Sequence, residues 1–238
     1  AIAEQHAVTF AAGIATENKK PVVAIYSTFL QRAYDQLIHD VAVQNLDVTF
    51  ALDRSGLVGE DGPTHSGNYD IAYLRCIPNM VICTPSDENE TRKLLTTAYL
   101  HNGPASVRYP RGTGPNSNID KDLKPLKIGK ANIINDEGSE IIILNFGTLL
   151  NEANEISKEL KATLVDMRFV KPLDEKLLSK LLKKAKVFIS IEDGSIMGGA
   201  GSAVQEFVSK ENLNVRSILF GIPDKFIEHA SREEMLVE

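Results

Sequence analysis

The sequence has 238 residues, of which 43% are hydrophobic and 24% are charged, and these proportions are typical of a soluble globular protein. The 26 Lys and Arg residues against 32 Asp and Glu residues give a net charge of −6, so charge provides no reason to expect a nucleic acid or an anionic membrane as a partner. No apolar run approaches the roughly 20 residues of a membrane span, and the five histidines lack metal-binding spacing, which disfavours a membrane protein and a zinc protein.

The first half of the chain predicts helices alternating with strands. Apolar residues recur at helical spacing over 28–44, whereas short apolar runs indicate buried strands. Ser86 or Asp87 can cap the helix that follows the last strand of this half. The expected elements are, in order, helix 3–15, strand 21–26, helix 28–44, strand 48–52, strand 81–83 and a helix beginning after residue 86.

The second half repeats the alternation after a stretch rich in Gly, Pro, Asn and Asp. The expected elements are strand 141–144, helix 149–160, strand 162–165, helix 174–184, strand 187–191, a helix after 199 and strand 215–220. Such alternation is typical of parallel sheets covered by helices on both faces. We therefore predict the α/β fold class, with two consecutive parallel-sheet domains at 1–111 and 126–238 joined by a linker at 112–125.

Polar, Gly-rich residues follow the second predicted strand, where ligands bind in open α/β sheets. Residues 53–67 form a connection longer than the usual βα loop of about 2–6 residues, and they hold Arg54, Asp61 and His65. A solvated surface loop is the plainer alternative to a functional loop. The composition favours the functional one.

Two other segments carry chemically useful side chains. Tyr26, Phe29 and Arg32 follow a strand and offer a hydroxyl, an aromatic ring and a cation within one turn, although Phe29 can also be core and Arg32 a surface charge. Arg111 can bind a phosphate or carboxylate with two parallel hydrogen bonds, or it can form an interdomain salt bridge. Glu4 lies in an alanine-rich helix, so its carboxylate is either buried with a partner or at an exposed end.

Glycines and cysteines support simpler interpretations. Residues 197–202 open a helix with three glycines, and close packing is favoured there over an anion-binding nest. Cys76 and Cys83 form no CxxC pair and are expected in the core. The low cysteine count and the absence of a basic N-terminal signal region favour the cytoplasm. The chain begins without methionine, inside a predicted helix, which suggests a fragment.

Seven segments, in order and in spacing, resemble the 1-deoxy-D-xylulose-5-phosphate synthase family of transketolase-like thiamine-diphosphate enzymes. They are residues 1–9, 26–36, 59–65, 84–90, 108–112, 165–174 and 197–201. The resemblance implies an N-terminally truncated transketolase-like pyrimidine-binding domain followed by a transketolase C-terminal-like domain. The family's first domain, which binds the cofactor diphosphate through Mg²⁺, has no counterpart here, so no metal ligand is assigned. We expect the truncation to expose a sheet edge and the isolated chain to be inactive.

The resemblance implies a transferase that uses thiamine diphosphate and Mg²⁺. Its reaction joins the two-carbon unit of decarboxylated pyruvate to D-glyceraldehyde 3-phosphate, giving 1-deoxy-D-xylulose 5-phosphate and CO₂ for isoprenoid, thiamine and pyridoxal synthesis. A homodimer of the full-length enzyme is expected. The alternatives are a transketolase, a 2-oxoacid dehydrogenase β-type chain, or a non-catalytic half-site or assembly module.

The resemblance also implies roles for individual residues. Glu4 matches the glutamate that hydrogen-bonds N1′ of the cofactor's aminopyrimidine and favours its reactive tautomer, and Phe29 matches the aromatic ring that stacks on that group. His65 is the candidate for proton transfer to the developing alkoxide, with Asp61 beside it near the reacting carbons. Substrate-binding roles fall to Tyr26, Arg32, Arg54, Asp61, His65 and Arg111.

Overall fold

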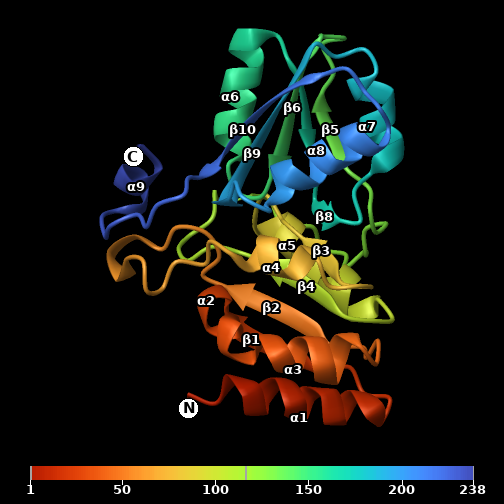
Figure 1. Cartoon of the computed structure of the whole chain (residues 1–238), viewed down its shortest axis with the longest axis vertical. Helices are drawn as coiled ribbons and strands as arrows, with labels where there is room; N and C mark the ends of the chain where they lie inside the picture. Colours follow the sequence, from red (N-terminus) through yellow and green to blue (C-terminus); the bar gives the residue numbers. More distant parts are fainter. Residues whose placement is uncertain (1, 116, 238) are drawn as a thin grey trace.

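The computed structural model describes residues 2–115 and 117–237. The outer ends of the predicted domains, residues 1 and 238, and residue 116 of the predicted linker lie outside the described residues. Two five-stranded sheets lie one above the other along the long axis of the molecule (Figure 1). This arrangement confirms the predicted α/β fold class with parallel-rich sheets.

The first sheet has the strand order β1-β2-β4-β3-β8. Its strands are β1 (Val22–Tyr26), β2 (Thr49–Asp53), β4 (Ala105–Arg108), β3 (Val81–Cys83) and β8 (Phe169–Lys171). The first four are parallel, whereas β8 pairs with β3 in the antiparallel direction. Strand β8 comes from the second half of the chain, so the two predicted domains share this sheet. Neither β8 nor β4 was predicted, because β8 is an antiparallel strand outside the regular alternation and β4 contains Ser106 and Arg108 instead of a purely apolar run.

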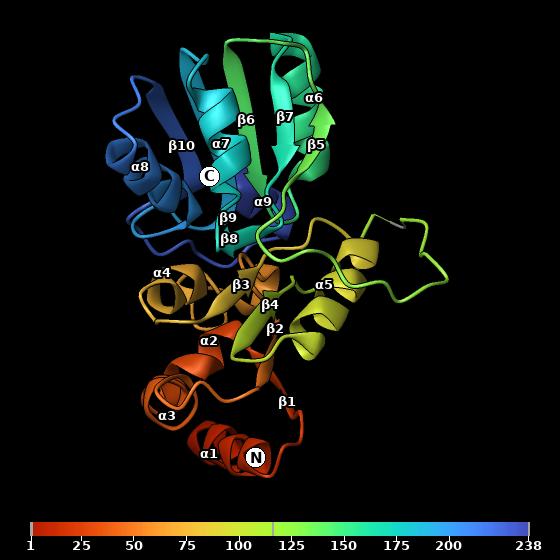
Figure 2. The same ribbon diagram turned by 90° about the vertical axis from the view of Figure 1, so that its right-hand side faces the viewer.

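The second sheet has the order β10-β9-β6-β7-β5. Its strands are β10 (Arg216–Ile222), β9 (Val187–Ser195), β6 (Ile141–Phe146), β7 (Thr163–Asp166) and β5 (Asn132–Asn135). Only β5, at one edge, is antiparallel. Figures 1 and 2 show helix α6 (Leu150–Leu160) on one face and helices α7 (Glu175–Leu182) and α8 (Ala200–Lys210) on the other.

The helices of the first domain also lie on both sides of their sheet. Figure 2 shows α5 (Glu88–Leu100) on one side and α4 (Asp70–Arg75) on the other, and α1 (Glu4–Thr16) lies farthest from the second sheet. The predicted helix 28–44 has the expected extent but is irregular. It divides into α2 (Ser27–Leu30), a 3₁₀ turn (Gln31–Ala33), α3 (Tyr34–Gln36) and a π-helical turn (Leu37–Ala42). Apolar periodicity predicts the buried face and leaves the hydrogen-bond pitch undetermined.

Local sequence signals and a shared core explain these elements. The Asp87 side chain accepts a hydrogen bond from the Glu90 amide at 2.8 Å and begins α5, as predicted. One continuous cluster of buried apolar side chains includes Phe50 from the first sheet and Phe146 and Phe188 from the second. Burying such rings contributes roughly 1.5–3 kcal/mol each. The shared core therefore holds the two sheets together.

This packing brings the carboxyl ends of strands from both sheets to one place. Strand β2 ends at Asp53, β4 ends at Arg108, and β9 passes through Asp193 near its own carboxyl end. The segment after β2 includes a 3₁₀ turn, η3 (Gly59–Asp61), and it lies beside the C-terminal helix α9 (Arg232–Val237) (Figure 1). None of the described helices combines the length and the apolar character that crossing a membrane requires.

Candidate functional site

Glu4 is buried at the start of α1, where its side chain is held by Arg32. The residue is 8% exposed, and Arg32 Nη1 donates a hydrogen bond to Glu4 Oε1 at 2.9 Å. The second oxygen, Oε2, is buried and has no hydrogen-bond partner among the described residues. Of the two sequence-based alternatives, the buried and partnered one is correct. A buried acceptor without a partner is costly and is a position at which a ligand donor fits.

Aromatic rings connect this acid to the segment after β2. The guanidinium of Arg32 lies 4.8 Å from the centre of the Phe29 ring, which stacks on Tyr26 at 5.1 Å. The edge of His65 meets the same Phe29 ring at 5.5 Å, and Arg54 lies 4.3 Å from the centre of the Tyr26 ring. The residues that follow β1 and β2 therefore form one connected set of side chains, as expected when two neighbouring parallel strands end at the same edge.

An exposed ion-paired cluster completes this set. Arg54 and Arg111 both pair with the carboxylate of Asp61, and the distance from Arg111 Nη1 to Asp61 Oδ2 is 2.8 Å. Arg111 also donates to the carbonyl oxygen of Val58 at 3.3 Å. The contacts of Arg111 thus lie within the first domain, so of the two alternatives the interdomain salt bridge is not formed among the described residues. Two cations against one carboxylate leave a positive excess that suits an anion.

His65 lies at the exposed side of the same site. Its Nδ1 atom and the hydroxyl of Thr64 are 2.9 Å apart, and the opposite ring nitrogen forms no hydrogen bond with the described residues. The hydroxyl of Thr28, from α2, donates to the Thr64 carbonyl at 3.5 Å. A histidine held through one ring nitrogen can present the other to a ligand.

A second arginine cluster, missed from sequence, lies beneath the loop. Arg108 is 3% exposed, and its Nε donates to Asp70 Oδ2 at 2.8 Å. Its Nη1 pairs with Asp193 of β9, which is equally buried. Burial by itself lowers the pKa of Arg108, but the adjacent Asp193 and Asp70 carboxylates raise it above the ordinary value. A sequence signal existed, because Glu192 and Asp193 stand at the carboxyl end of a predicted strand.

The C-terminal segment covers the loop from the other side. Leu57 of the loop packs with Ile222, Ile227 and Met235 in one apolar cluster. At Gly62, whose φ is +66°, an added Cβ would lie 3.0 Å from the Cβ of His229, so only glycine fits there without displacement. The site residues of the first domain are thus supported by residues of the second.

A cavity of about 560 Å³ opens beside Arg111 and extends to the second domain. Its walls include Tyr109, Arg111, Thr113, Thr148, Asn151 and Arg232. Arg232 donates from Nη2 to the hydroxyl of Thr148 at 3.3 Å, and its Nε is buried without a partner among the described residues. Arg232 was not among the predicted site residues, because it lies in a six-residue helix that no sequence pattern marks.

The glycine cluster at 197–202 contains an anion-binding helix start, but the anion is the chain's own. Glu192 accepts hydrogen bonds from the amides of Ala200 and Gly201, both at 2.8 Å. Burial raises the pKa of Glu192 to about 7, although these amides oppose the shift. No group of three or more His, Cys, Asp or Glu side chains within 2–115 and 117–237 is arranged to hold a metal ion.

Comparisons with known families cover nearly the whole chain. The family described as transketolase, pyrimidine-binding domain matches residues 1–116, and the family described as transketolase, C-terminal domain matches residues 129–238. Two 1-deoxy-D-xylulose-5-phosphate synthases, from Pseudomonas fluorescens (strain Pf0-1) and Pseudomonas aeruginosa (strain LESB58), are 60% and 62% identical over all 238 residues. The chain spans 38% of the length of each of these relatives.

Solved structures give the same relationship. A split-gene transketolase, described as an inactive β4 tetramer, is 26% identical and superposes with a TM-score of 0.87 over 98% of this chain and 76% of its own. A transketolase from Campylobacter jejuni subsp. jejuni NCTC 11168 is 19% identical, with a TM-score of 0.73 over 95% of this chain and 35% of its own. The second likeness concerns the fold alone.

Proposed function

Because this chain belongs to the transketolase family, in the group of the 1-deoxy-D-xylulose-5-phosphate synthases, we propose that it supplies the pyrimidine-binding and C-terminal domains of such a synthase. The reaction decarboxylates pyruvate and joins the remaining two carbons to D-glyceraldehyde 3-phosphate. The products are 1-deoxy-D-xylulose 5-phosphate and CO₂. Identity of 60% or more over the whole chain supports this proposal over a transketolase or a 2-oxoacid dehydrogenase β chain.

The free oxygen of Glu4 is the observation on which the proposal depends. A buried carboxylate with one oxygen held by Arg32 and the other without a partner fits the ring nitrogen of an aminopyrimidine. Phe29, which lies among Tyr26, Arg32 and His65 beside this carboxylate, is proposed to stack on the same ring. When bound, thiamine diphosphate supplies the carbon nucleophile. In the proposal, Glu4 holds the cofactor's tautomer and Phe29 holds its orientation.

The exposed arginine cluster is proposed to bind the phosphate of the acceptor. Arg54 and Arg111 can each direct a forked set of N–H donors at phosphate oxygens. In the described structure both arginines pair with Asp61, so a phosphate must compete with that carboxylate. Tyr26 keeps Arg54 in place through its ring face. This competition makes acceptor binding sensitive to the position of Asp61.

His65 and Arg32 are proposed to act closer to the reacting carbons. His65 lies against Phe29, and one of its ring nitrogens forms no hydrogen bond with the described residues. It can therefore pass a proton to the alkoxide that forms as the carbon–carbon bond is made. Arg32, fixed between Glu4 and the Phe29 ring, can hold a substrate anion on the other side. Asp61 orients the acceptor next to His65.

The remaining parts of the proposal concern what the chain must be joined to. We propose that a diphosphate-binding domain with the Mg²⁺ ligands completes the site, that the complete enzyme is a cytoplasmic homodimer, and that this chain alone is inactive. The split-gene transketolase that it resembles is described as an inactive β4 tetramer, which supports inactivity of such a chain by itself.

A complementation assay tests this function. The chain, completed with a diphosphate-binding domain, is expected to release CO₂ from pyruvate in a reaction that D-glyceraldehyde 3-phosphate stimulates. Glu4→Gln should lower turnover by at least about a hundredfold, because the proton relay loses its acid. Lys19→Gln, on an exposed surface away from the site, is the matched control. Two-carbon transfer from a ketose phosphate would indicate a transketolase, and no turnover under any complementation would indicate a binding module.

A further inference from the structure

Arg108 contacts four acceptor groups that belong to three residues in two distant parts of the chain. Its Nε and Nη2 atoms donate to the two oxygens of Asp70 at 2.8 and 3.1 Å, and Nη2 also donates to the carbonyl of Gly67 at 3.2 Å. Its Nη1 pairs with Asp193 of the second domain, whose carbonyl lies 3.5 Å from Nη2. All three nitrogen atoms of this buried guanidinium therefore donate to oxygen atoms of Gly67, Asp70 or Asp193.

Arg108 contacts the far end of the loop that carries Arg54, Asp61 and His65 directly through Gly67, and it is connected to the near end through Asp70. Gly56 and Gly67 close the base of this loop by exchanging two backbone hydrogen bonds of 2.8 and 2.9 Å. Ser55, at the near end, donates to the carboxylate of Asp70 at 3.4 Å. Asn68, at the far end, accepts a hydrogen bond from the Ser195 amide of β9 at 2.8 Å.

The second domain touches this base through Asp193 with little free space. Gly56 has φ +75°, and a Cβ added there would lie 2.9 Å from both the carbonyl oxygen and the Oδ2 atom of Asp193. The same Oδ2 atom of Asp193 also accepts a hydrogen bond from the Thr148 hydroxyl at 3.2 Å. A shift of β9 toward the loop would therefore displace Gly56 at the loop base.

We propose that Arg108 and Asp193 are positioning residues for the reaction: through them the C-terminal domain sets where the loop places its substrate-binding side chains. The inference rests on the proposed function for the identity of the substrate. We call the Arg108–Asp193 pair the clamp. Arg111 lies three residues after Arg108, so the clamp also determines the position of this second arginine of the exposed cluster. The Arg108 and Asp193 side chains are buried, so in this proposal they act through the loop rather than on the substrate itself.

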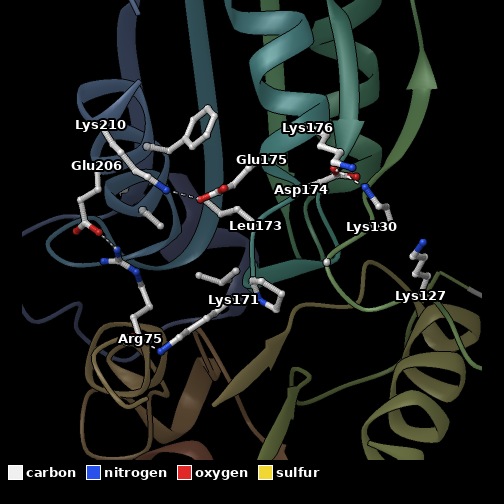
Figure 3. A pocket seen from close by; sticks show the side chains of 15 residues that line it. Arg75, Lys127, Lys130, Lys171, Leu173, Asp174, Glu175, Lys176, Glu206 and Lys210 are labelled. Atoms are coloured by element: carbon white, nitrogen blue, oxygen red, sulfur yellow. Dashed lines mark hydrogen bonds and ion pairs between the residues drawn. The ribbon is translucent and has the colours of Figure 1, made fainter. Parts of the chain in front are cut away.

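The groove between the domains on another side provides a control (Figure 3). There Arg75 of α4 pairs with Glu206 of α8 at 2.6 Å, and Lys171 donates to the carbonyl of Arg75 at 3.0 Å. The Glu206 side chain is 70% exposed, and its ion pair is with Arg75 rather than with any of residues 54–67. Glu206→Gln thus removes an interdomain ion pair without touching the loop base.

The test compares Asp193→Asn, Arg108→Lys and Glu206→Gln in the cofactor-loaded enzyme that contains this chain. In the first two variants the KM for D-glyceraldehyde 3-phosphate should rise about tenfold, since charge-assisted hydrogen bonds to its phosphate are misplaced. The KM for pyruvate and the affinity for thiamine diphosphate should change by less than about twofold, because Glu4 and Phe29 lie outside the clamp. Glu206→Gln should match the wild type.

Hydrogen exchange provides a readout that does not depend on activity. The amides of Gly56 and Gly67 should exchange at least about tenfold faster in Asp193→Asn, and at the wild-type rate in Glu206→Gln. If Asp193→Asn does not fold, Thr148→Val removes the hydroxyl that contacts Asp193 and Arg232 and should accelerate the same amides by about threefold. Equal exchange in the clamp and control variants would overturn the inference.

The two readouts separate this inference from the proposed function. A wild-type enzyme that fails to convert pyruvate and D-glyceraldehyde 3-phosphate would reject the function, and the loop amides would still decide whether the clamp holds the loop. Conversely, an active enzyme whose acceptor KM and loop amides are unchanged in Asp193→Asn and Arg108→Lys would reject the clamp alone.

Discussion

Two arginine–aspartate clusters lie at the same loop and use the same chemistry in different surroundings. In the buried cluster, Arg108, Asp70 and Asp193 have side chains that are 1–4% exposed. In the exposed cluster, Arg54, Asp61 and Arg111 have side chains that are 22–42% exposed. Water can replace either partner in the second cluster and cannot do so in the first. Burial, rather than the residue types, separates a fixed contact from an exchangeable one.

The difference assigns the two clusters different tasks. A buried charge that loses its partner is left without water, so the Arg108 cluster stays paired throughout the life of the folded protein. An exposed pair contributes about 0–1 kcal/mol, so a phosphate dianion can displace Asp61 from its arginines. In our proposal the buried cluster therefore positions the loop, and the exposed cluster binds the substrate.

The largest expected effect is that of Arg108→Ala on stability. The substitution leaves Asp70 and Asp193 buried without a cation, which costs about 3–5 kcal/mol of unfolding free energy. Urea unfolding followed by circular dichroism measures it. The matched variant, Arg111→Ala, should change the same quantity by less than about 1 kcal/mol. Equal losses in the two variants would remove the distinction between the clusters.

Asp166 sharpens the comparison because it is a buried carboxyl without an arginine fork. It is 2% exposed, Ser86 donates to its Oδ2 at 3.0 Å, and its Oδ1 has no hydrogen-bond partner among the described residues. Burial raises its pKa from 3.8 to about 7. At a pH between 3.8 and about 7, Asp166 therefore holds a proton in the folded state that it has released in the unfolded state. Its contribution to stability therefore falls as the pH rises from about 4 to about 7.

Replacing this carboxyl by an amide should remove that part of the pH dependence. Asp166→Asn should be more stable than the wild type above about pH 7, by an amount on the order of a few kcal/mol, and the gain should disappear near pH 4. Urea unfolding at several pH values measures the difference. Glu192, with a pKa also raised to about 7, contributes in the same direction and remains in the variant. A gain that is independent of pH would contradict this account.

Arg111→Ala addresses the exposed cluster through substrate binding. The variant should raise the KM for D-glyceraldehyde 3-phosphate by about ten- to a hundredfold, since a charge-assisted hydrogen bond contributes about 1.5–3 kcal/mol. Steady-state kinetics of the completed enzyme measures it. Arg111→Lys keeps the charge but loses the forked geometry, so its KM should lie between those of the wild type and Arg111→Ala. A lower kcat with an unchanged KM would place Arg111 outside acceptor binding.

The exposed cluster could be predicted from sequence, whereas for the buried cluster the sequence marks only Asp193, at the end of a predicted strand, and not its partner Arg108. Arg54, Asp61 and His65 follow an apolar strand in a long polar loop, and the strand-end rule indicates a site from these local features alone. Arg108 ends a strand of four residues, and its partner Asp193 lies 85 positions later. An arginine in such a strand predicts a surface charge until the packing of β9 is known.

The fold shows the same division between local and distant information. Alternating apolar runs predicted most of the strands of both sheets and the fold class, since each run is buried by its own helices. Strand β8 was missed because it is an antiparallel edge strand that pairs with β3 of the other predicted domain, about 85 positions earlier, through Cys83 and Phe169. Glu4 was left undecided, because its burial depends on Arg32, which a different helical segment supplies. Pairings across long sequence separations are determined by packing.

The smallest expected effect is that of Asp61→Asn on stability, and it tests the comparison most directly. Asp61 pairs with both Arg54 and Arg111, as Asp70 and Asp193 pair with Arg108. If the number of ion pairs determined stability, Asp61→Asn would be costly. Because its partners reach water, we expect a change below about 1 kcal/mol in unfolding free energy, and less still at about 1 M salt, where screening is strong. Asp70→Asn, the buried counterpart, should lose several kcal/mol at either salt concentration. A large, salt-independent loss in Asp61→Asn would mean that the exposed arginines are needed for folding, and they could then not exchange their carboxylate for a phosphate.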